Sequence, residues 1–380
     1  MKLLSKYKKF FLNYSDFDYE TIDRLITSFV ADGCIKMDAS PGLPYSTTHA
    51  TNRKFLDTSI HFIIHLVWSR IQLRLKHRDV TSPIEMINLG LCDPVKLFVK
   101  EEPHKLRKIK EGRVRLIMSV SIIDKLIEMI LIKSLKDLEI ANWTSIPSKP
   151  GMGFTAEMVK TIYDRVHEMK RPISTDVEGW DWSVSQWLLD ADADMIIRLC
   201  NNPFEDWVNL IKLTANIEGS SVYCLSDSRM FILTVRGNQN SGKLKTSMSN
   251  SRMRALAAII AGCEDCICMG DDNVEEYVVG AIEKYQAMGI KVKIYEEIND
   301  QFEFCSKIFT NDSCYPVSYG KTLMKLLHQK PRSWEEYVGY MVGFEDEMRG
   351  HPQFTTIMDL INRTGFVQQG GEQMRCDEDE

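Results

Sequence analysis

The pattern of apolar and polar residues predicts a chain that mixes helices with short strands. Apolar residues recur at helical spacing in a series of segments. These segments are Tyr14–Val30, Ile60–Lys76, Ile122–Leu138, Trp182–Leu199, Ala281–Met288, Trp334–Met348 and Phe354–Asn362. Shorter or alternating apolar runs predict strands. These runs are Leu97–Val99, Val114–Ile117, Val274–Val279, Gly289–Ile294 and Phe302–Phe309. From about Tyr315 onward we expect the chain to be largely helical.

The most unusual short segment is Gly270-Asp271-Asp272. Apolar residues precede it from Cys266 to Met269 and Val274 follows it, which predicts a buried strand, a tight turn and a second strand. Two adjacent carboxylates between apolar flanks are unfavourable unless a positive charge lies nearby. A divalent cation that prefers oxygen ligands, Mg²⁺ or Mn²⁺, meets that need. Taken alone, however, the segment is more typical of a solvated surface hairpin.

Composition places the chain among globular proteins and adds limits on its partners. It has 380 residues, 44% hydrophobic and 26% charged, which allows two or three units or one multi-lobed enzyme. The formal net charge of −6 argues against nucleic-acid binding over the whole surface but permits a local basic channel. Ten scattered cysteines without a signal-peptide pattern favour free thiols in a reducing cytosol. No apolar run reaches the roughly 18 residues of a membrane span.

One segment, Lys96–Arg115, is strongly basic within this acidic chain. It holds eight lysines or arginines against three acids. Its two predicted strands would present the basic loop as a hairpin, and phosphate groups of a nucleotide or nucleic acid are its natural partners. When the segment is taken alone, a solvated hairpin is the alternative.

A second acidic site lies at Asp176 and Asp181. Ile173 and Val177 flank Asp176 as in a strand end, and Asp181 follows across a glycine-containing turn. One acid can therefore sit at the strand tip while the other lies on the turn. Alternatively, Asp181 is the N-cap of the helix predicted after it.

A polar loop that runs into a helix follows at Gly237–Asn250. Thr246 and Asn250 are four residues apart and share one helix face. The many small polar groups of this segment suit hydrogen bonding to a sugar or to a template backbone.

Together these pieces predict a nucleotidyl-transfer site. Such sites use two divalent ions about 3.5–4 Å apart, held by acids from separate strands. Asp176 and Asp271 are the best candidate ligands, with Asp272 beside them. One ion would activate the attacking 3′-oxygen and the other would neutralise the pyrophosphate leaving group. The cations of Lys96–Arg115 would hold the incoming triphosphate.

The same segments resemble motifs of the RNA-dependent RNA polymerases of positive-strand RNA viruses, nearest to the sobemovirus/luteovirus-like group. Asp176–Asp181 resembles motif A, and Gly270-Asp271-Asp272 matches motif C. Ser241-Gly242 with Thr246 and Asn250 is similar to motif B. The remaining resemblances are Pro41–Tyr45 to motif G, Lys100–Lys105 with Arg113–Ile117 to motif F, and Phe304–Lys307 to motif E. The resemblance covers roughly residues 40–310.

The resemblance implies an α+β right-hand polymerase fold, with an antiparallel palm sheet backed by helices and a small helix-rich thumb. The expected divisions are fingers over 1–170 with motifs G and F, palm over 171–190 with motif A, a fingers insertion over 191–237, palm over 238–310 with motifs B to E, and thumb with an acidic tail over 311–380. The tail from Gln368 is expected to be disordered.

The resemblance also implies roles for particular residues. Asp176, Asp271 and Asp272 would be catalytic and, with Val177, would hold two Mg²⁺ or Mn²⁺ ions. Asp181 and Asn250 would read the ribose 2′-hydroxyl. The other expected nucleotide contacts are Lys100, Lys108, Arg113, Arg115, Ser241 and Thr246. The expected template and primer contacts are Pro41, Gly42, Pro44, Gly242, Cys305, Ser306 and Lys307. Either Lys291 or Lys293 would be the general acid for pyrophosphate.

The implied substrates and partners are rNTPs, an RNA template, the nascent RNA, and other viral replication proteins or a protein primer. The implied location is the host cytoplasm, including membrane-associated replication complexes. Two other functions are considered, a reverse transcriptase-like DNA polymerase and a non-catalytic RNA-binding replication subunit. Asp181 with Asn250, and the methionine at position 269, favour RNA synthesis over the first. The three acids favour catalysis over the second.

Two further metal sites are weaker hypotheses. Cys263, Cys266 and Cys268 lack an evident fourth zinc ligand nearby, so we expect core thiols. His61 and His65 are four residues apart but have no third ligand close in sequence, so we expect them in the core or facing a partner.

Overall fold

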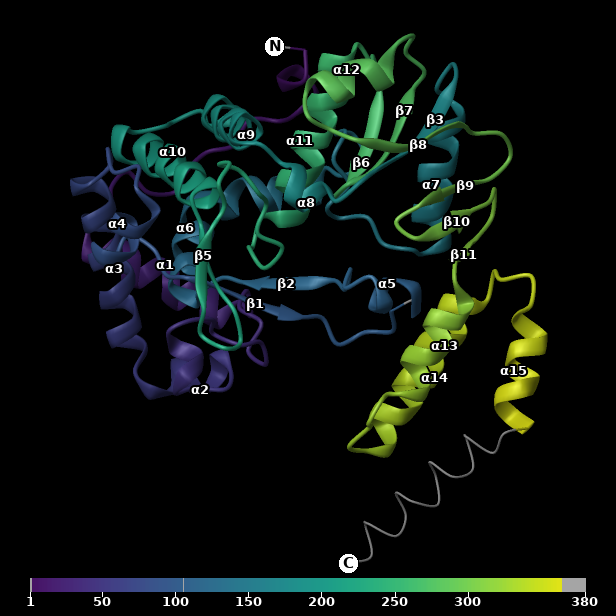
Figure 1. The fold of residues 1–380 in the computed structure, drawn as a ribbon, viewed down its shortest axis with the longest axis horizontal. Coiled ribbons are helices and arrows are strands. Elements are labelled where there is room, and N and C mark those ends of the chain that lie inside the picture. Colours follow the sequence, from purple (N-terminus) through teal and green to yellow (C-terminus); the bar gives the residue numbers. More distant parts are fainter. Residues whose placement is uncertain (1, 105, 364–380) are drawn as a thin grey trace, which may run out of the picture. The chain divides into compact units, whose positions relative to one another are not determined.

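The chain folds into two structural units, each built from segments that are far apart in the sequence. The computed structural model describes residues 2–104 and 106–363. Unit 1 contains Met1–Lys100, Arg115–Met152 and Thr175–Glu296, and unit 2 contains Glu101–Val114, Gly153–Ser174 and Glu297–Glu380. Figure 1 traces the path of the chain. The division into fingers, palm and thumb stays a prediction, and the predicted tail from Gln368 lies outside the described residues.

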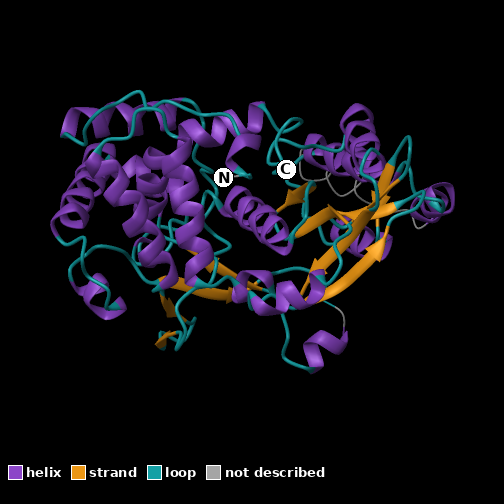
Figure 2. Cartoon of the chain, turned by 90° about the horizontal axis from the view of Figure 1, so that it is seen from above, coloured by secondary structure: helices purple, strands orange, loops and turns teal. Residues whose placement is uncertain are grey.

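Helices form most of unit 1 and enclose its main hydrophobic core. They are α1 (Tyr19–Ala31), α2 (Asn52–Thr58), α3 (Ile60–Lys76), α4 (Pro83–Asn88), α6 (Ile122–Ala141), α8 (Trp180–Ser183), α9 (Gln186–Leu199), α10 (Glu205–Gly219), α11 (Thr246–Ala261) and α12 (Ala281–Ala287). Figure 2 shows many of them gathered on the left, the side that carries α1, α3 and α10 in Figure 1. Fully buried Trp207 of α10 donates its indole N–H to Leu131 O of α6 at 3.0 Å, so the core includes its own polar pairing.

Helix caps explain where several of these helices begin. Ser59 accepts a hydrogen bond from Phe62 N–H, and α3 begins and ends as predicted. By contrast, α1 begins five residues later than predicted, at Tyr19. Asp18 is extended and caps this helix by accepting from Thr21 N–H, so the preceding residues are not helical.

The basic segment forms the predicted antiparallel hairpin. β1 (Val95–Val99) pairs with β2 (Leu116–Ser119) in the sheet β2-β1-β4-β5, which β4 (Val222–Cys224) and β5 (Met230–Ile232) complete. The loop between β1 and β2 was predicted without secondary structure, but it contains the short helix α5 (Leu106–Lys110). Most of that loop, Glu101–Val114, belongs to unit 2.

The acidic segments meet in a second four-stranded sheet. Its order is β6-β7-β3-β8, formed by β6 (Cys266–Met269), β7 (Asp272–Glu276), β3 (Pro172–Val177) and β8 (Val292–Glu297). β6 and β7 form the predicted hairpin, with Met269 opposite Asp272. The fold thus makes the two acid-bearing strands, β3 and β7, direct neighbours.

The single helix predicted over Trp182–Leu199 is wrong. Val184 and Ser185 are extended and separate α8 from α9. They pair instead with a distant segment, because Ser185 forms a bridge with Gly237 and Val184 O accepts from Asn238 N–H at 2.6 Å. The predicted N-cap role of Asp181 is also wrong, since Gly179 precedes α8 and Asp181 lies in its first turn.

Unit 2 combines a small antiparallel sheet with helices. Its helices include α5, α7 (Ala156–His167), α13 (Tyr319–Leu327), α14 (Trp334–Met348) and α15 (Phe354–Arg363). Its sheet, β11-β10-β9, is formed by β9 (Phe302–Phe304), β10 (Lys307–Phe309) and β11 (Cys314–Pro316). The predicted single strand Phe302–Phe309 is therefore a hairpin, turned by positive φ angles at Cys305 and Ser306. The predicted helix from Tyr315 begins only at Tyr319.

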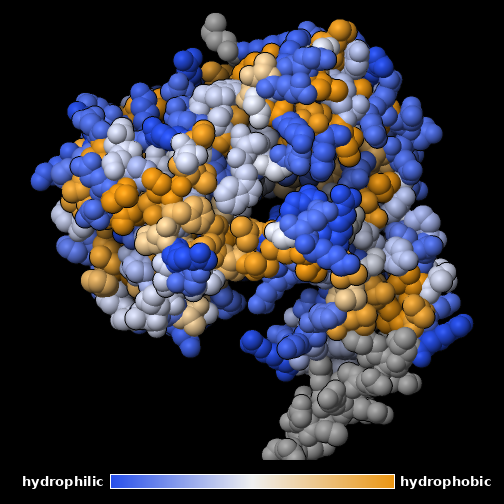
Figure 3. Space-filling model, viewed as in Figure 1, coloured by the Kyte–Doolittle hydropathy of each residue, from blue (hydrophilic) through white to orange (hydrophobic). Residues whose placement is uncertain are grey.

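Apolar side chains also reach the surface of both units. In unit 1 they gather over β1, β2 and β5 (Figure 3), where Met230, Phe231 and Ile232 are exposed. In unit 2 they include Met324 and Leu327 of α13. Within residues 2–104 and 106–363, no helix has both the length and the apolar character needed to cross a membrane.

Two glycines of unit 1 differ in how closely another backbone segment approaches them. Gly33 and Gly42 both have left-handed backbones, with φ of 66° and 73°. A Cβ at Gly33 meets nothing within 4 Å, whereas a Cβ at Gly42 would lie 2.7 Å from Val120 O. We expect Gly33→Ala to cost about 1 kcal/mol of stability, and Gly42→Ala to cost clearly more because backbone must also move. Thermal unfolding of the two variants measures this, and equal losses would contradict the close approach.

Candidate active site

The β6–β7 turn presents two acids at its tip. Gly270 has a φ of 66°, and its N–H donates to Ser251 Oγ of α11 at 2.9 Å, so the turn is held by the helix behind it. Asp271 is exposed and Asp272 is half-buried at the start of β7. The sequence pattern therefore predicted this turn correctly, while its support by Ser251 was not predicted.

The residues next to Asp176 and Asp272 in the chain, Thr175 and Asn273, point to the opposite face of the sheet and join β3 to β7 there. Thr175 Oγ1 accepts hydrogen bonds from Arg254 Nη2 at 2.6 Å and from Asn273 Nδ2 at 3.0 Å. Thr175 and Asn273 are both buried. Successive strand residues point to opposite faces of a sheet. Because Thr175 and Asn273 are bonded on one face, Asp176 and Asp272 point to the opposite face.

Further buried polar groups complete this support. Asn273 Nδ2 donates to Glu275 Oε2 at 2.6 Å, and Tyr285 OH of α12 donates to the same oxygen. The Arg254 guanidinium lies 4.8 Å from the centre of the Tyr285 ring. Sequence reasoning missed all of these residues. The alternation of Thr175 with Asp176 and of Asn273 with Asp272 is the signal that would have found two of them.

Asp181 lies close to both the acidic turn and α11. Asn250 Nδ2 donates to Asp181 Oδ1 at 3.1 Å, so the two predicted ribose-binding residues are paired with each other. The pKa of Asp181 is raised to about 6, chiefly by burial; the charge of Asp271 adds to the rise, while the hydrogen bond from Asn250 and the charge of Arg115 oppose it. This electrostatic effect indicates that Asp271, Asp181 and Arg115 of unit 1 share one polar site.

The two candidate general acids face different carboxylates across the β3–β8 pairing. Lys293 Nζ lies 2.5 Å from Asp176 Oδ2, and Lys291 Nζ lies 2.5 Å from Glu178 Oε2. Both lysines are largely exposed, at 55% and 74% of the side chain. The sequence left the choice between them open, and only Lys293 contacts a predicted catalytic residue.

The small polar side chains around the start of α11 form hydrogen bonds with other groups of the protein. Ser241 Oγ accepts from Met118 N–H at 3.2 Å, and Thr246 Oγ1 donates to Asn240 O at 2.9 Å. A Cβ at Gly242 would lie 2.1 Å from Met118 O, so this position requires glycine. The predicted nucleotide or template contacts of Ser241, Gly242 and Thr246 stay predictions.

The predicted template loop at Pro41, Gly42 and Pro44 packs on the start of α6. Pro41 O accepts from Ile122 N–H at 2.8 Å, and the Leu43–Pro44 peptide bond is cis. Lys100 and Arg115 flank the basic loop, and Lys100 N–H donates to Arg115 O at 2.8 Å. The RNA or nucleotide contacts predicted for these residues stay predictions.

Other predicted contacts belong to unit 2. Arg113 Nε donates to Glu111 Oε2 at 2.7 Å, and Lys108 is exposed. Cys305 and Ser306 form the β9–β10 turn. Lys307 is mostly buried, with its Nζ 3.5 Å from Glu347 Oε1 and 4.8 Å from the centre of the Phe154 ring. Its observed contacts are therefore structural, and its predicted contact with primer stays a prediction.

The predicted ligand set fits a divalent cation by chemistry. Asp176, Asp271 and Asp272 supply carboxylate oxygens, and Val177 supplies a carbonyl, which are the donors that Mg²⁺ and Mn²⁺ prefer. The charge of Asp271 raises the pKa of Asp181, so the two carboxyl groups repel each other when both are ionised, and a bound cation would relieve this repulsion. Across residues 2–104 and 106–363, no three His, Cys, Asp or Glu side chains are already gathered at ligand distances.

The two weaker metal hypotheses concern the cysteines around β6 and the histidines of α3, and several of these side chains contact other groups of the protein. Cys263 Sγ donates to Asp265 O and Cys268 Sγ to Asn273 Oδ1, and burial raises the pKa of the Cys263 thiol. His61 and His65 are both exposed, so a core position for them is wrong. The His65 ring lies 5.7 Å from that of Trp68.

Solved structures with the same fold are polymerases of RNA viruses. The Sicinivirus 3Dpol RNA-dependent RNA polymerase matches with a TM-score of 0.58 at 14% identity, covering 76% of this chain and 65% of that one. An insertion-loop deletion mutant of the RNA-dependent RNA polymerase of a human picorbirnavirus matches with a TM-score of 0.56 at 14% identity, covering 74% and 62%. The predicted α+β right-hand polymerase fold is confirmed.

The chain belongs to the family of viral RNA-directed RNA polymerases. The family model, described as "Viral RNA-directed RNA-polymerase", matches residues 47–166 and 165–322. The RNA-directed RNA polymerase of Mushroom bacilliform virus is 35% identical over 317 residues, covering 77% of this chain and 75% of that protein. The resemblance stated from the motifs is thereby confirmed.

Longer relatives are replicase polyproteins of plant viruses. Replicase polyprotein P2AB of Southern cowpea mosaic virus is 35% identical over 366 residues, covering 90% of this chain and 36% of that protein. Its counterpart from Southern bean mosaic virus (isolate Bean/United States/Arkansas) is 39% identical over 318 residues, covering 78% and 32%. The chain thus spans about a third of the length of these relatives.

The raised pKa of Asp181 predicts a pH-dependent effect of Asp181→Asn. In the folded chain the pKa of this carboxyl is about 6, above its ordinary value of 3.8, so its ionisation costs stability as pH rises through this window. At pH 8 the variant should be more stable than the wild type by up to about 3 kcal/mol, and this advantage should vanish below about pH 4. Thermal unfolding from pH 4 to 8 measures it. Asp227→Asn, at the exposed β4–β5 turn, is the control, and a pH-independent difference for Asp181→Asn would contradict the assignment.

Proposed function

We propose that this chain is the catalytic part of a viral RNA-directed RNA polymerase, which transfers nucleotides from rNTPs to the 3′ end of an RNA chain on an RNA template. The observation that carries the proposal is the pairing of β3 with β7, which directs Asp176 and Asp272 to one face of one sheet beside Asp271. The name of the Mushroom bacilliform virus relative supports the same activity.

Asp176, Asp271 and Asp272, with Val177, would hold two Mg²⁺ or Mn²⁺ ions. When bound, these ions lower the pKa of the 3′-hydroxyl and neutralise charge on the triphosphate. Asp181 and Asn250, already paired at 3.1 Å, would present a carboxylate and an amide to the ribose 2′-hydroxyl. Lys293 would donate the proton that pyrophosphate needs to leave, since its ammonium lies beside Asp176.

The proposed partners follow from this activity. They are rNTPs, an RNA template and the nascent RNA, and the polyprotein relatives support other viral replication proteins or a protein primer in addition. The proposed location is the host cytoplasm, including membrane-associated replication complexes. A DNA-synthesising enzyme and a silent RNA-binding subunit are less favoured, because Asp181 is paired with Asn250 and all three predicted acids lie in the same sheet region.

Removal of one acid tests the activity. We expect Asp271→Ala to abolish RNA-templated extension with rNTPs while RNA affinity stays unchanged, because the carboxylate serves catalysis rather than RNA binding. Primer extension and RNA-binding titrations measure the two effects, with Asp227→Ala as a control for loss of an exposed acid. Unchanged extension would refute the metal assignment. Equal or better extension by the wild type with dNTPs would favour the reverse transcriptase-like alternative.

Lys293 of β8 and Lys291, just before this strand, provide a matched pair of variants. Lys293→Met should lower the rate of the chemical step about 100-fold and remove a basic limb from its pH profile, because a general acid is lost. Lys291→Met removes the same charge beside Glu178 and should change the rate only a few-fold. Single-turnover extension across pH measures both, and equal effects of the two variants would contradict the assignment of Lys293.

A further inference from the structure

Two lysines in the loop before α11 point into the protein rather than toward solvent. The side chains of Lys243 and Lys245 are only 8% and 6% exposed. Lysine is seldom buried to this extent unless it is paired with an acid. These cations therefore hold the loop in place and do not form part of an exposed RNA-binding surface.

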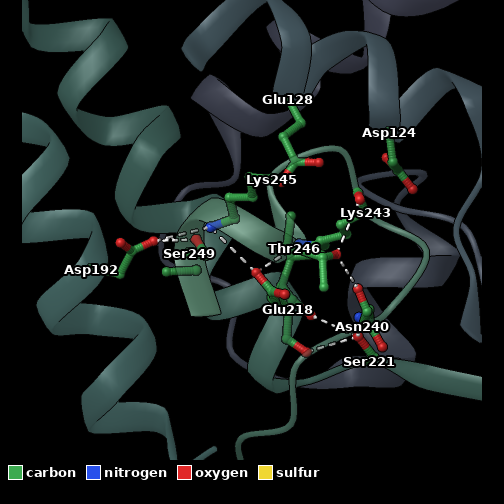
Figure 4. A network of polar contacts seen from close by, with 12 residues as sticks. Asp124, Glu128, Asp192, Glu218, Ser221, Asn240, Lys243, Lys245, Thr246 and Ser249 are labelled. Carbon is green, nitrogen blue, oxygen red and sulfur yellow. Dashed lines mark hydrogen bonds and ion pairs between the residues drawn. The ribbon is translucent and has the colours of Figure 1, made fainter. Parts of the chain in front are cut away.

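The acids that pair with the lysines come from helices outside the loop. Glu218 of α10 is fully buried, and its Oε2 lies 2.9 Å from Lys243 Nζ and 3.4 Å from Lys245 Nζ (Figure 4). Asp192 of α9 lies 3.8 Å from Lys245 Nζ, and Glu128 of α6 accepts from Leu244 N–H at 2.9 Å. Glu218 is thus the acid that contacts both lysines.

The same loop is bonded to the proposed ribose-binding pair at both ends. Before the lysines, Gln239 N–H donates to Asp181 O at 2.8 Å. After them, Thr246 begins α11 and donates its hydroxyl to Lys243 O at 3.0 Å, and Asn250 follows one turn later. A shift of the loop would therefore change the distance between Asp181 and Asn250.

A backbone contact places α10 against the start of this loop as well. Gly237 N–H donates to Gly219 O at 3.0 Å, directly after Glu218. Farther along, Asn240 Nδ2 donates to Ser221 Oγ at 2.8 Å. The end of α10 and the residues just after it therefore contact the loop repeatedly, although none of them is a predicted site residue.

We propose that Glu218 is a positioning residue for sugar selection. Its carboxylate holds Lys243 and Lys245, which sets the loop and the first turn of α11 so that Asn250 meets Asp181. Glu218 acts only through these residues and does not contact the nucleotide. The inference rests on the proposed function, since it assigns ribose recognition to Asp181 and Asn250.

The test is Glu218→Gln, which keeps the shape of the side chain and removes its charge. We expect the preference for rNTPs over dNTPs, as a ratio of kcat/KM values, to fall about tenfold or more, because a small misplacement of a binding group has effects of this size. Most of the change should appear as a higher KM for rNTPs. Hydrogen exchange of amides in residues 238–245 should become faster.

Glu139→Gln is the matched control. Glu139 is also a buried acid and also pairs with α11, through Arg252 Nη1 at 2.8 Å, but has no such contact with the lysines of the loop. We expect it to lower the Tm while the rNTP preference and loop exchange stay near wild type. The double variant Glu218→Gln/Lys243→Gln should regain part of the lost preference, because it removes one uncompensated buried cation.

The outcomes are distinguishable. A folded Glu218→Gln variant with wild-type preference and wild-type loop exchange would overturn the inference, as would an equal loss of preference in Glu139→Gln. If Glu218→Gln does not fold, Lys245→Met tests the same contact by the same two readouts. Failure of the wild type to extend RNA would instead refute the proposed function, and the exchange of residues 238–245 would still report whether Glu218 holds the loop.

Discussion

Hydrogen bonds to one hydroxyl group, that of Thr175, tie strand β3 to the neighbouring strand β7 and to helix α11. Arg254 and Asn273 both donate to it from below the sheet. Because losing a hydrogen bond to a buried amide is costly, the bond from Asn273 of β7 to Thr175 of β3 favours one register between these strands. That register decides that Asp176 and Asp272 share a face. The proposed chemistry on one side of the sheet therefore depends on buried polar contacts on the other.

Helix α11 links these contacts to the rest of unit 1. Within five residues it supplies Asn250 to Asp181, Ser251 to the acidic turn, Arg252 to Asp192, and Arg254 to Thr175. A helix turns by about 100° per residue, so these side chains leave in different directions. The position of one helix thus couples the Asp181–Asn250 pair, proposed to bind ribose, to the acidic turn and to the strand that carries Asp176.

Local sequence signals predicted the parts of this site that depend on local structure. Glycine followed by two acids between apolar runs predicted the β6–β7 turn, and helical spacing predicted α3 and α14 with their bounds. The break between α8 and α9 could not be found in this way, because it results from pairing with Gly237, far along the chain. The β9–β10 turn was missed because Cys305 and Ser306 replace the glycine or asparagine expected at positive φ. Polarity alone does not reveal which way Lys243 and Lys245 point.

Lys291, just before β8, and Lys293 within it show how strand register limits an insertion. Lys291 opposes Glu178 and Lys293 opposes Asp176, so their ammonium groups share one face of the edge strand. Suppose that one residue is added between Gly289 and Lys291 and that β8 then pairs with β3 one residue out of its present register. Val292 would then take the place of Lys293 beside Asp176. Both lysines would then turn to the other face. The composition of β8 would be unchanged, yet Asp176 would lose its cation, so the length of this short connection is itself part of the site.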